Sequence, residues 1–135
     1  MDKKLEANKE MVINFFKTAF IERDPEKAVQ LYVGSYYTQH NPFFPDGKQG
    51  FIKKVKQWTG DNFNRQFEFK RVIAEGDYVM LHVRQILAED DKDFGVSANG
   101  NAVIDIFRLE NRKIVEHWDV VHVVPTESAN NNTMF

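Results

Sequence analysis

Apolar residues recur at helical spacing in three segments of the first half of the chain. The first segment sets its apolar residues three or four positions apart on a polar background: Val12, Phe15, Phe16, Ala19 and Phe20. This spacing predicts an amphipathic helix that ends near Glu22-Arg23. A short second helix is expected to begin at Asp24-Pro25, since aspartate favours the N-cap and proline the first helical position. A third amphipathic helix is predicted from about Gln49 to Thr59.

After Gly60 the pattern changes from helical to alternating. Four long strands are predicted over residues 67–73, 78–87, 94–109 and 114–124, with a brief strand over 36–40. Glu75-Gly76-Asp77 has the composition of a hairpin turn. Three helices followed by an antiparallel meander predict an α+β fold, cone-shaped, with the helices packed on a strongly curved and mainly antiparallel sheet.

The last predicted hairpin carries ionisable residues in strands that otherwise have the composition of a core. Asp105 interrupts the first strand, and His117 and Asp119 interrupt the second. An ionisable group in a core needs a partner or a purpose, because burying an unpaired charge is costly. His117 and Asp119 share one face, since side chains alternate along a strand. These residues therefore predict a pocket.

The face occupied by Asp105 depends on the turn between the two strands. A two-residue turn at Asn111-Arg112 would pair Leu109 with Ile114 and needs positive φ at both turn residues. A three-residue loop would pair Leu109 with Lys113 and place Asp105 opposite His117, with only Arg112 in the left-handed region. We favour the three-residue loop, which gives one face carrying Asp105, His117 and Asp119.

The length of 135 residues suits one domain over 1–135, with residues 125–135 as a C-terminal tail. A formal charge of −2 without clustered basic residues argues against a nucleic-acid partner. The absence of cysteine excludes disulfides and thiolate catalysis. No apolar run has the length of a membrane span or a signal peptide, so we expect a cytoplasmic protein without a membrane partner.

Several motifs, in order along the chain, resemble those of the SnoaL-like polyketide cyclases, a branch of the nuclear transport factor 2 and ketosteroid isomerase superfamily. They follow a phenylalanine-rich first helix and are Asp24-Pro25, Tyr37–Pro42, Glu75–Val79, Asp105–Arg108 and Lys113–Val120. The resemblance implies a nuclear transport factor 2-like (cystatin-like) fold. The Asn-rich end also resembles that of a SnoaL-like subgroup expected to catalyse aldol condensation.

By resemblance to ketosteroid isomerases, Asp105 matches an aspartate that stays protonated in the pocket and donates to the substrate oxyanion. The general base of those enzymes corresponds to Asn41, which cannot take a proton at neutral pH. Their oxyanion-hole tyrosine would lie on the first helix, which has none. SnoaL-type cyclases instead use an aspartate and a histidine of the last strands, which His117 and Asp119 resemble. These remove a proton next to a carbonyl with no metal or organic cofactor.

Further residues are expected to contact the ligand, a small apolar carbonyl compound: His40, Asn41, Phe16, Phe20, Trp58, His82 and Val121. Some of the predicted site residues could instead have a purely structural role. Asp105 could instead bridge to Arg71 or Arg84, and His82 could be a hydrogen-bonded core residue.

The sequence leaves the function open between two classes. One is a cofactor-independent cyclase, isomerase or aldol-type catalyst, and the other is a carrier that binds a similar ligand without catalysis. A third alternative, which we rank below both, is a metal-dependent oxygenase. His117 and Asp119 have the spacing of two ligands of a 2-His-1-carboxylate iron site, with a third ligand from His82, His40 or His122. We also expect a homodimer through the outer sheet face, because the residues around Trp118 are too apolar to stay exposed.

Overall fold

The computed structural model describes residues 2–60 and 62–135. Four α-helices, α1 (Lys3–Phe16), α2 (Pro25–Tyr32), α3 (Gly47–Trp58) and α4 (Phe94–Ser97), accompany a π-helix η1 (Lys17–Ile21). The strands are β1 (Val33–Gln39), β2 (Arg65–Glu75), β3 (Tyr78–Leu87), β4 (Asn101–Glu110) and β5 (Lys113–Val123). None of the described helices is both long and apolar enough to cross a bilayer.

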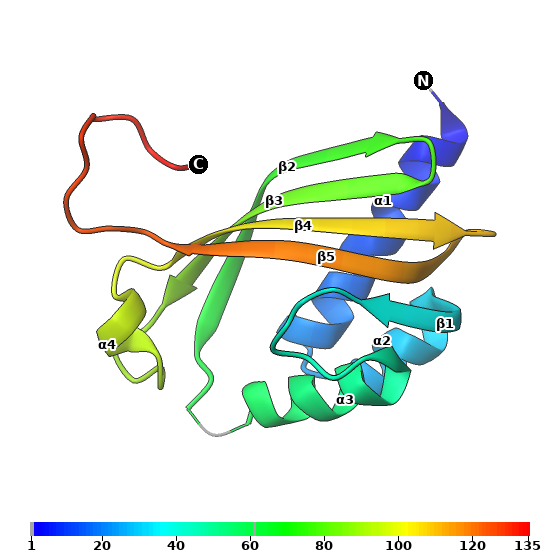
Figure 1. The fold of residues 1–135 in the computed structure, drawn as a ribbon, viewed down its shortest axis with the longest axis horizontal. Coiled ribbons are helices and arrows are strands. Elements are labelled where there is room, and N and C mark those ends of the chain that lie inside the picture. The colour runs from blue at the N-terminus through cyan, green and yellow to red at the C-terminus, as the bar shows by residue number, and fades with distance from the viewer. Residues whose placement is uncertain (1, 61) are drawn as a thin grey trace.

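The strands form one sheet in the order β1-β5-β4-β3-β2, antiparallel except for β1, which runs parallel to β5. In Figure 1, α1 crosses behind the long strands and α2 and α3 lie beside β1. This arrangement confirms the predicted α+β fold, with helices on a curved, mainly antiparallel sheet. The core between the layers is rich in aromatic side chains, with Phe15 contacting the rings of Tyr37, Phe51 and Phe107.

The start of α2 and the turn between β2 and β3 lie where the sequence predicted them. The carboxylate of Asp24 accepts from the backbone N–H of Lys27, and Pro25 occupies the first turn of α2, as predicted. The hairpin turn at Gly76 is also confirmed, because Glu75 pairs with Tyr78 and Gly76 has a φ of +58°. These features place the helices and the first two long strands close to their predicted bounds.

The strand predicted over residues 94–109 is wrong in its first part, where residues 94–97 form α4 and β4 begins only at Asn101. Gly100 separates the two elements with a φ of +80°, and a Cβ there would lie 2.1 Å from the carbonyl oxygen of Gln85. Only glycine allows this close approach of two backbones. The connection from β3 to α4 is held by Asp91, whose carboxylate accepts a hydrogen bond from Arg65.

The predicted three-residue loop of the last hairpin is also wrong. Glu110 pairs with Lys113 across a two-residue turn, in which Asn111 and Arg112 have φ values of +48° and +64°. A three-residue loop would have placed Lys113 opposite Leu109, whose side chain points into the core and is 2% exposed. The cost of burying a lysine exceeds the strain of one non-glycine residue at positive φ.

A β-bulge then changes the register of this hairpin. Leu109 pairs with Ile114 but Arg108 pairs with Glu116, so Val115 is an extra residue in β5. The bulge shifts the pairing of the following residues of β5 by one position, so that each of their side chains changes face. Asp105 therefore pairs with Asp119, and not with His117 as the three-residue loop predicted. Asp105, His117 and Asp119 therefore share the inner face of the sheet, as predicted, although through a different turn.

Candidate active site

A cavity of about 550 Å³ lies between the helices and the inner face of the sheet. Its wall is rich in aromatic side chains, and the helical segments contribute Phe16, Phe20 and Trp58. Val121 and Asn41, also expected to contact a ligand, line it too. A cavity of this size with this lining suits a small, largely apolar molecule.

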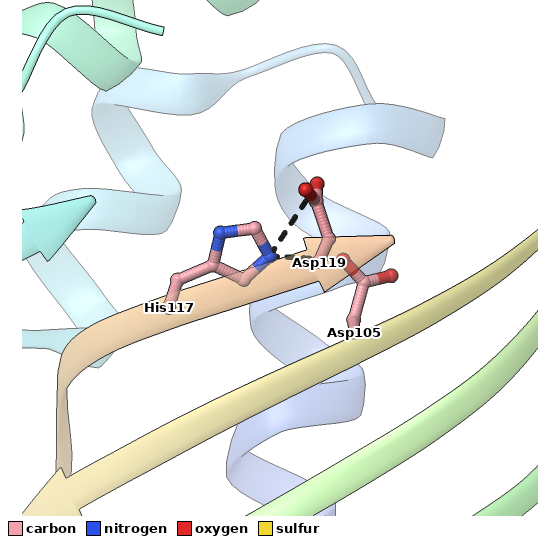
Figure 2. Close-up of side chains that lie close together, drawn as sticks. All are labelled: Asp105, His117 and Asp119. Carbon is pink, nitrogen blue, oxygen red and sulfur yellow. Dashed lines mark hydrogen bonds and ion pairs between the residues drawn. The ribbon is translucent and has the colours of Figure 1, made fainter. Parts of the chain in front are cut away.

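Three ionisable side chains from neighbouring strands meet in this cavity. Figure 2 shows His117 and Asp119 projecting from β5 toward Asp105 on β4. Nε2 of His117 lies 2.9 Å from Oδ1 of Asp105 and 3.9 Å from Oδ2 of Asp119. His117 and Asp105 are 7% and 6% exposed, so their interaction takes place away from bulk water. This cluster is the candidate catalytic centre.

Gln39, at the end of β1, determines which nitrogen of His117 carries a proton. Oε1 of Gln39 accepts from the backbone N–H of Asn41 at 3.0 Å, which identifies it as the oxygen of the amide. The same oxygen lies 2.7 Å from Nδ1 of His117. Because an amide oxygen only accepts, Nδ1 must be the protonated nitrogen.

One proton must then lie between His117 and Asp105. With Nδ1 protonated, the 2.9 Å contact of Nε2 with Oδ1 requires a proton on one of these two atoms. Burial raises the pKa of Asp105, and the nearby carboxylate of Asp119 adds to this, while the hydrogen bond and charge of His117 oppose it. The pair therefore stores an exchangeable proton inside the cavity.

Asn41 holds the third member of the cluster. Its Nδ2 lies 2.9 Å from both carboxylate oxygens of Asp119 and donates to them. The amide orientation is fixed by the backbone N–H of Phe43, which donates to Oδ1 of Asn41 at 2.8 Å. The residue that matches the isomerase base by resemblance is thus a donor that positions a carboxylate from another strand.

The sequence prediction missed Tyr37 and Gln39 as site residues. Both line the cavity beside the cluster, and the rings of Tyr37 and His117 stack at 6.4 Å. Burial raises the pKa of Tyr37 well above its ordinary value, and the carboxylates of Asp105 and Asp119 add to the effect. The available signal was the alternation of Tyr37, Gln39 and Asn41 in one short segment, which puts the first two on one face.

Two histidines expected to contact the ligand lie outside the cavity. His40 bonds to Glu116 at 2.7 Å, and its ring stacks on Trp118 at 4.6 Å. His82 contacts Arg71 at 2.9 Å and the carbonyl oxygen of Met134 at 3.0 Å. The alternative bridges from Asp105 to Arg71 or Arg84 do not form either, since Asp105 binds His117.

The cluster offers three ligand atoms within 4.8 Å of one another, one each from Asp105, His117 and Asp119. It is not the 2-His-1-carboxylate arrangement, because the described cluster contains one histidine and His40, His82 and His122 lie elsewhere. Its donor atoms are also already engaged, with one another and with Asn41. The residues present therefore do not fit the iron site considered from the sequence.

Comparison with known proteins places the chain in a family. The chain resembles a putative SnoaL-like polyketide cyclase from Jannaschia sp. CCS1, with 18% identity, a TM-score of 0.69, and 90% of this chain and 89% of the other covered. It resembles TsrD from Streptomyces laurentii with 20% identity, a TM-score of 0.68 and 90% of each chain covered.

An epoxide hydrolase of the LEH-like type from M. tuberculosis has the same fold, with 14% identity, a TM-score of 0.63, and 89% and 86% coverage. At these identities the likeness shows the fold, and it confirms the nuclear transport factor 2-like prediction. A search of curated proteins gave no match. The family model described as SnoaL-like polyketide cyclase matches residues 10–130, and the chain therefore belongs to the SnoaL-like polyketide cyclase family.

Proposed function

We propose that the protein is a cofactor-independent acid–base catalyst that acts on a small, largely apolar carbonyl compound through an enolate, as a cyclase, isomerase or aldol-type enzyme. The observation that carries this proposal is the meeting of Asp105, His117 and Asp119 inside an aromatic cavity. Buried ionisable groups that share protons are costly to a fold and are concentrated at catalytic sites.

Each group has a role in this scheme. Asp119, held by Asn41, takes the proton from the carbon next to the carbonyl, and the electron pair of that C–H bond moves toward the carbonyl oxygen. The proton shared by His117 and Asp105 is available to the oxygen as negative charge develops on it. Return of a proton to carbon, or attack of the enolate on a second carbonyl group, completes the turnover.

Binding without catalysis is the second candidate, and one observation favours it. The position that matches the isomerase base by resemblance is Asn41, and its amide donates to both oxygens of Asp119. These bonds occupy a lone pair on each oxygen that could otherwise accept a proton from carbon. The same cavity would then act as a carrier site for a similar ligand.

Deuterium incorporation into 2-tetralone, a fused-ring enolisable ketone, tests the proposal. Mass spectrometry in D₂O would follow exchange at the carbon next to the carbonyl, and calorimetry would follow binding. We expect catalysed exchange that Asp119→Asn slows by a factor on the order of 10²–10⁴. His122→Gln is the matched control, because His122 is exposed on the same strand. Binding of the ketone with no acceleration of exchange would favour the carrier.

A further inference from the structure

The cavity has a second polar end, built by different residues from the catalytic cluster. Asn101 and Asp105 lie four residues apart on the inner face of β4, which separates their backbones by about 13 Å. Gln85 on β3 pairs with Asn101. Both residues line the cavity, and they are 7% and 6% exposed. A ligand that reaches both ends of the cavity is therefore elongated.

The hydrogen bonds at this end engage the oxygen of Gln85 and leave its amide nitrogen without a partner among the described residues. Oε1 of Gln85 accepts from Nδ2 of Asn101 at 2.9 Å and from Nη1 of Arg65 at 3.4 Å. Arg65 has only donors, so the amide oxygen of Gln85 must face it. Nε2 of Gln85 then points away, and it has no acceptor among residues 2–60 and 62–135. This N–H₂ group is not fully shielded from solvent and belongs to a residue that lines the cavity, so a ligand oxygen would replace water as its acceptor.

The charges at this end favour a neutral ligand group. Arg65 is almost fully buried and bonds to Asp91 through Nε at 2.9 Å and Nη2 at 3.2 Å. It also pairs with Asp93. Although burial of Asp91 acts in the opposite direction, these bonds from Arg65 and the backbone N–H of Asp93 lower the pKa of Asp91. The guanidinium of Arg65 faces two carboxylates, so Arg65 itself offers no excess positive charge to an anion.

We propose that Gln85 and its neighbours form a recognition subsite for a neutral oxygen, a hydroxyl or carbonyl, at the end of the substrate remote from the reacting carbonyl. Nε2 of Gln85 donates to that oxygen, and Arg65 and Asn101 hold the Gln85 amide in position. The proposal deepens the proposed function and rests on it only for the placement of the reacting carbonyl at the Asp119 end. The substrate class is a neutral, elongated ketone with an oxygen at its far end.

Calorimetric binding of a matched ligand series tests this subsite without requiring turnover. The probes are 2-acetylnaphthalene, 6-hydroxy-2-acetylnaphthalene and 6-acetyl-2-naphthoic acid, which carry hydrogen, a hydroxyl or a carboxylate opposite the ketone. We expect the hydroxyl compound to bind roughly three- to tenfold more tightly than the parent. The carboxylate should bind more weakly than the parent. Equal affinity of the first two compounds, or tighter binding of the carboxylate, would overturn the subsite.

Two variants assign the effect to Gln85. Gln85→Leu should remove the advantage of the hydroxyl compound, whereas Gln66→Leu, on the exposed side of β2, should keep it. Gln85→Glu retains an oxygen for Arg65 and Asn101 but lacks the donor, so it also loses the advantage and serves if the leucine variant does not fold. An advantage that survives either Gln85 change would refute the assignment. Because the readout is binding, a failure to exchange deuterium would refute the proposed catalysis and leave this result intact.

Discussion

Replacement of Asp105 separates the stability of the fold from the chemistry of the site. Asp105→Asn keeps the shape of the side chain and removes its charge. Gln39 leaves Nε2 of His117 unprotonated in the neutral ring, so the new amide can donate to it in place of the shared proton. Asp105→Leu offers no such donor and leaves a buried ring nitrogen unpaired. We therefore expect the leucine variant to be less stable than the asparagine variant by about 1–3 kcal/mol.

The pH dependence of stability follows from the raised pKa of Asp105. The unfolded chain releases this proton above the ordinary aspartate pKa of about 3.9, while the folded protein retains it to higher pH. The stability that Asp105 contributes is therefore fully present below that value and is lost as the pH rises through the pKa of the folded state. Each pKa unit of elevation corresponds to about 1.4 kcal/mol. Asp105→Asn removes this loss and should be more stable than the wild type at neutral pH.

Urea denaturation at several pH values from 4 to 8 measures this difference. We expect the advantage of Asp105→Asn over the wild type to grow with pH, while deuterium exchange into 2-tetralone falls by a factor on the order of 10²–10⁴. The stability of Asp119→Asn is measured for comparison, because Asp119 is a carboxylate of the same cluster that is less buried than Asp105. If Asp105→Asn were less stable than the wild type at every pH, the charged carboxylate of Asp105 beside His117 would stabilise the fold. Burial would then not be the effect that determines the stability of this pair.

Two further predictions concern parts of the molecule outside the cavity. Arg112→Gly should raise the free energy of unfolding by about 1 kcal/mol in urea denaturation, because Arg112 has a φ of +64° in the hairpin turn and glycine adopts it without strain; a destabilised variant would contradict this. We also propose a homodimer through the outer sheet face, where Tyr78 and Val120 are 48% and 68% exposed near Trp118. Sedimentation equilibrium should give a molecular mass of twice 15.8 kDa for the wild type and of 15.8 kDa for Val120→Glu. A wild-type protein that stays monomeric at high concentration would refute the dimer.

The sequence predicted the fold well because periodicity reports which faces are buried. It predicted the shared face of Asp105, His117 and Asp119 through an incorrect turn, and the reason lies in Ile114 and Val115. Both are buried, and two consecutive apolar residues do not reveal which of them is the extra residue of a bulge. A bulge changes the face of every later residue in its strand, so loop length alone could not determine the register.

The polar neighbours of the catalytic cluster were harder to predict because their partners come from distant strands. His40 and His82 have the residue type expected of a site, but they lie on the outer side of the sheet. Gln39 was passed over because an amide does not titrate. Its role depends on β1 lying parallel to β5, with Gln39 beside His117. That pairing joins residues 78 positions apart and leaves no local trace in the sequence.

The two amides of this segment explain how the cluster is held in one protonation pattern. The side-chain oxygen of Gln39 accepts from the backbone N–H of Asn41, and that of Asn41 accepts from the backbone N–H of Phe43. These bonds fix the orientation of both amides, and so which atom of each faces the cluster. The oxygen of Gln39 also keeps a proton on Nδ1 of His117, and the nitrogen of Asn41 keeps Asp119 an acceptor. Since amides do not titrate, Gln39 and Asn41 keep the same donor and acceptor atoms at every pH. Proton movement is thereby confined to Nε2 of His117 and the two carboxylates, where the proposed reaction needs it.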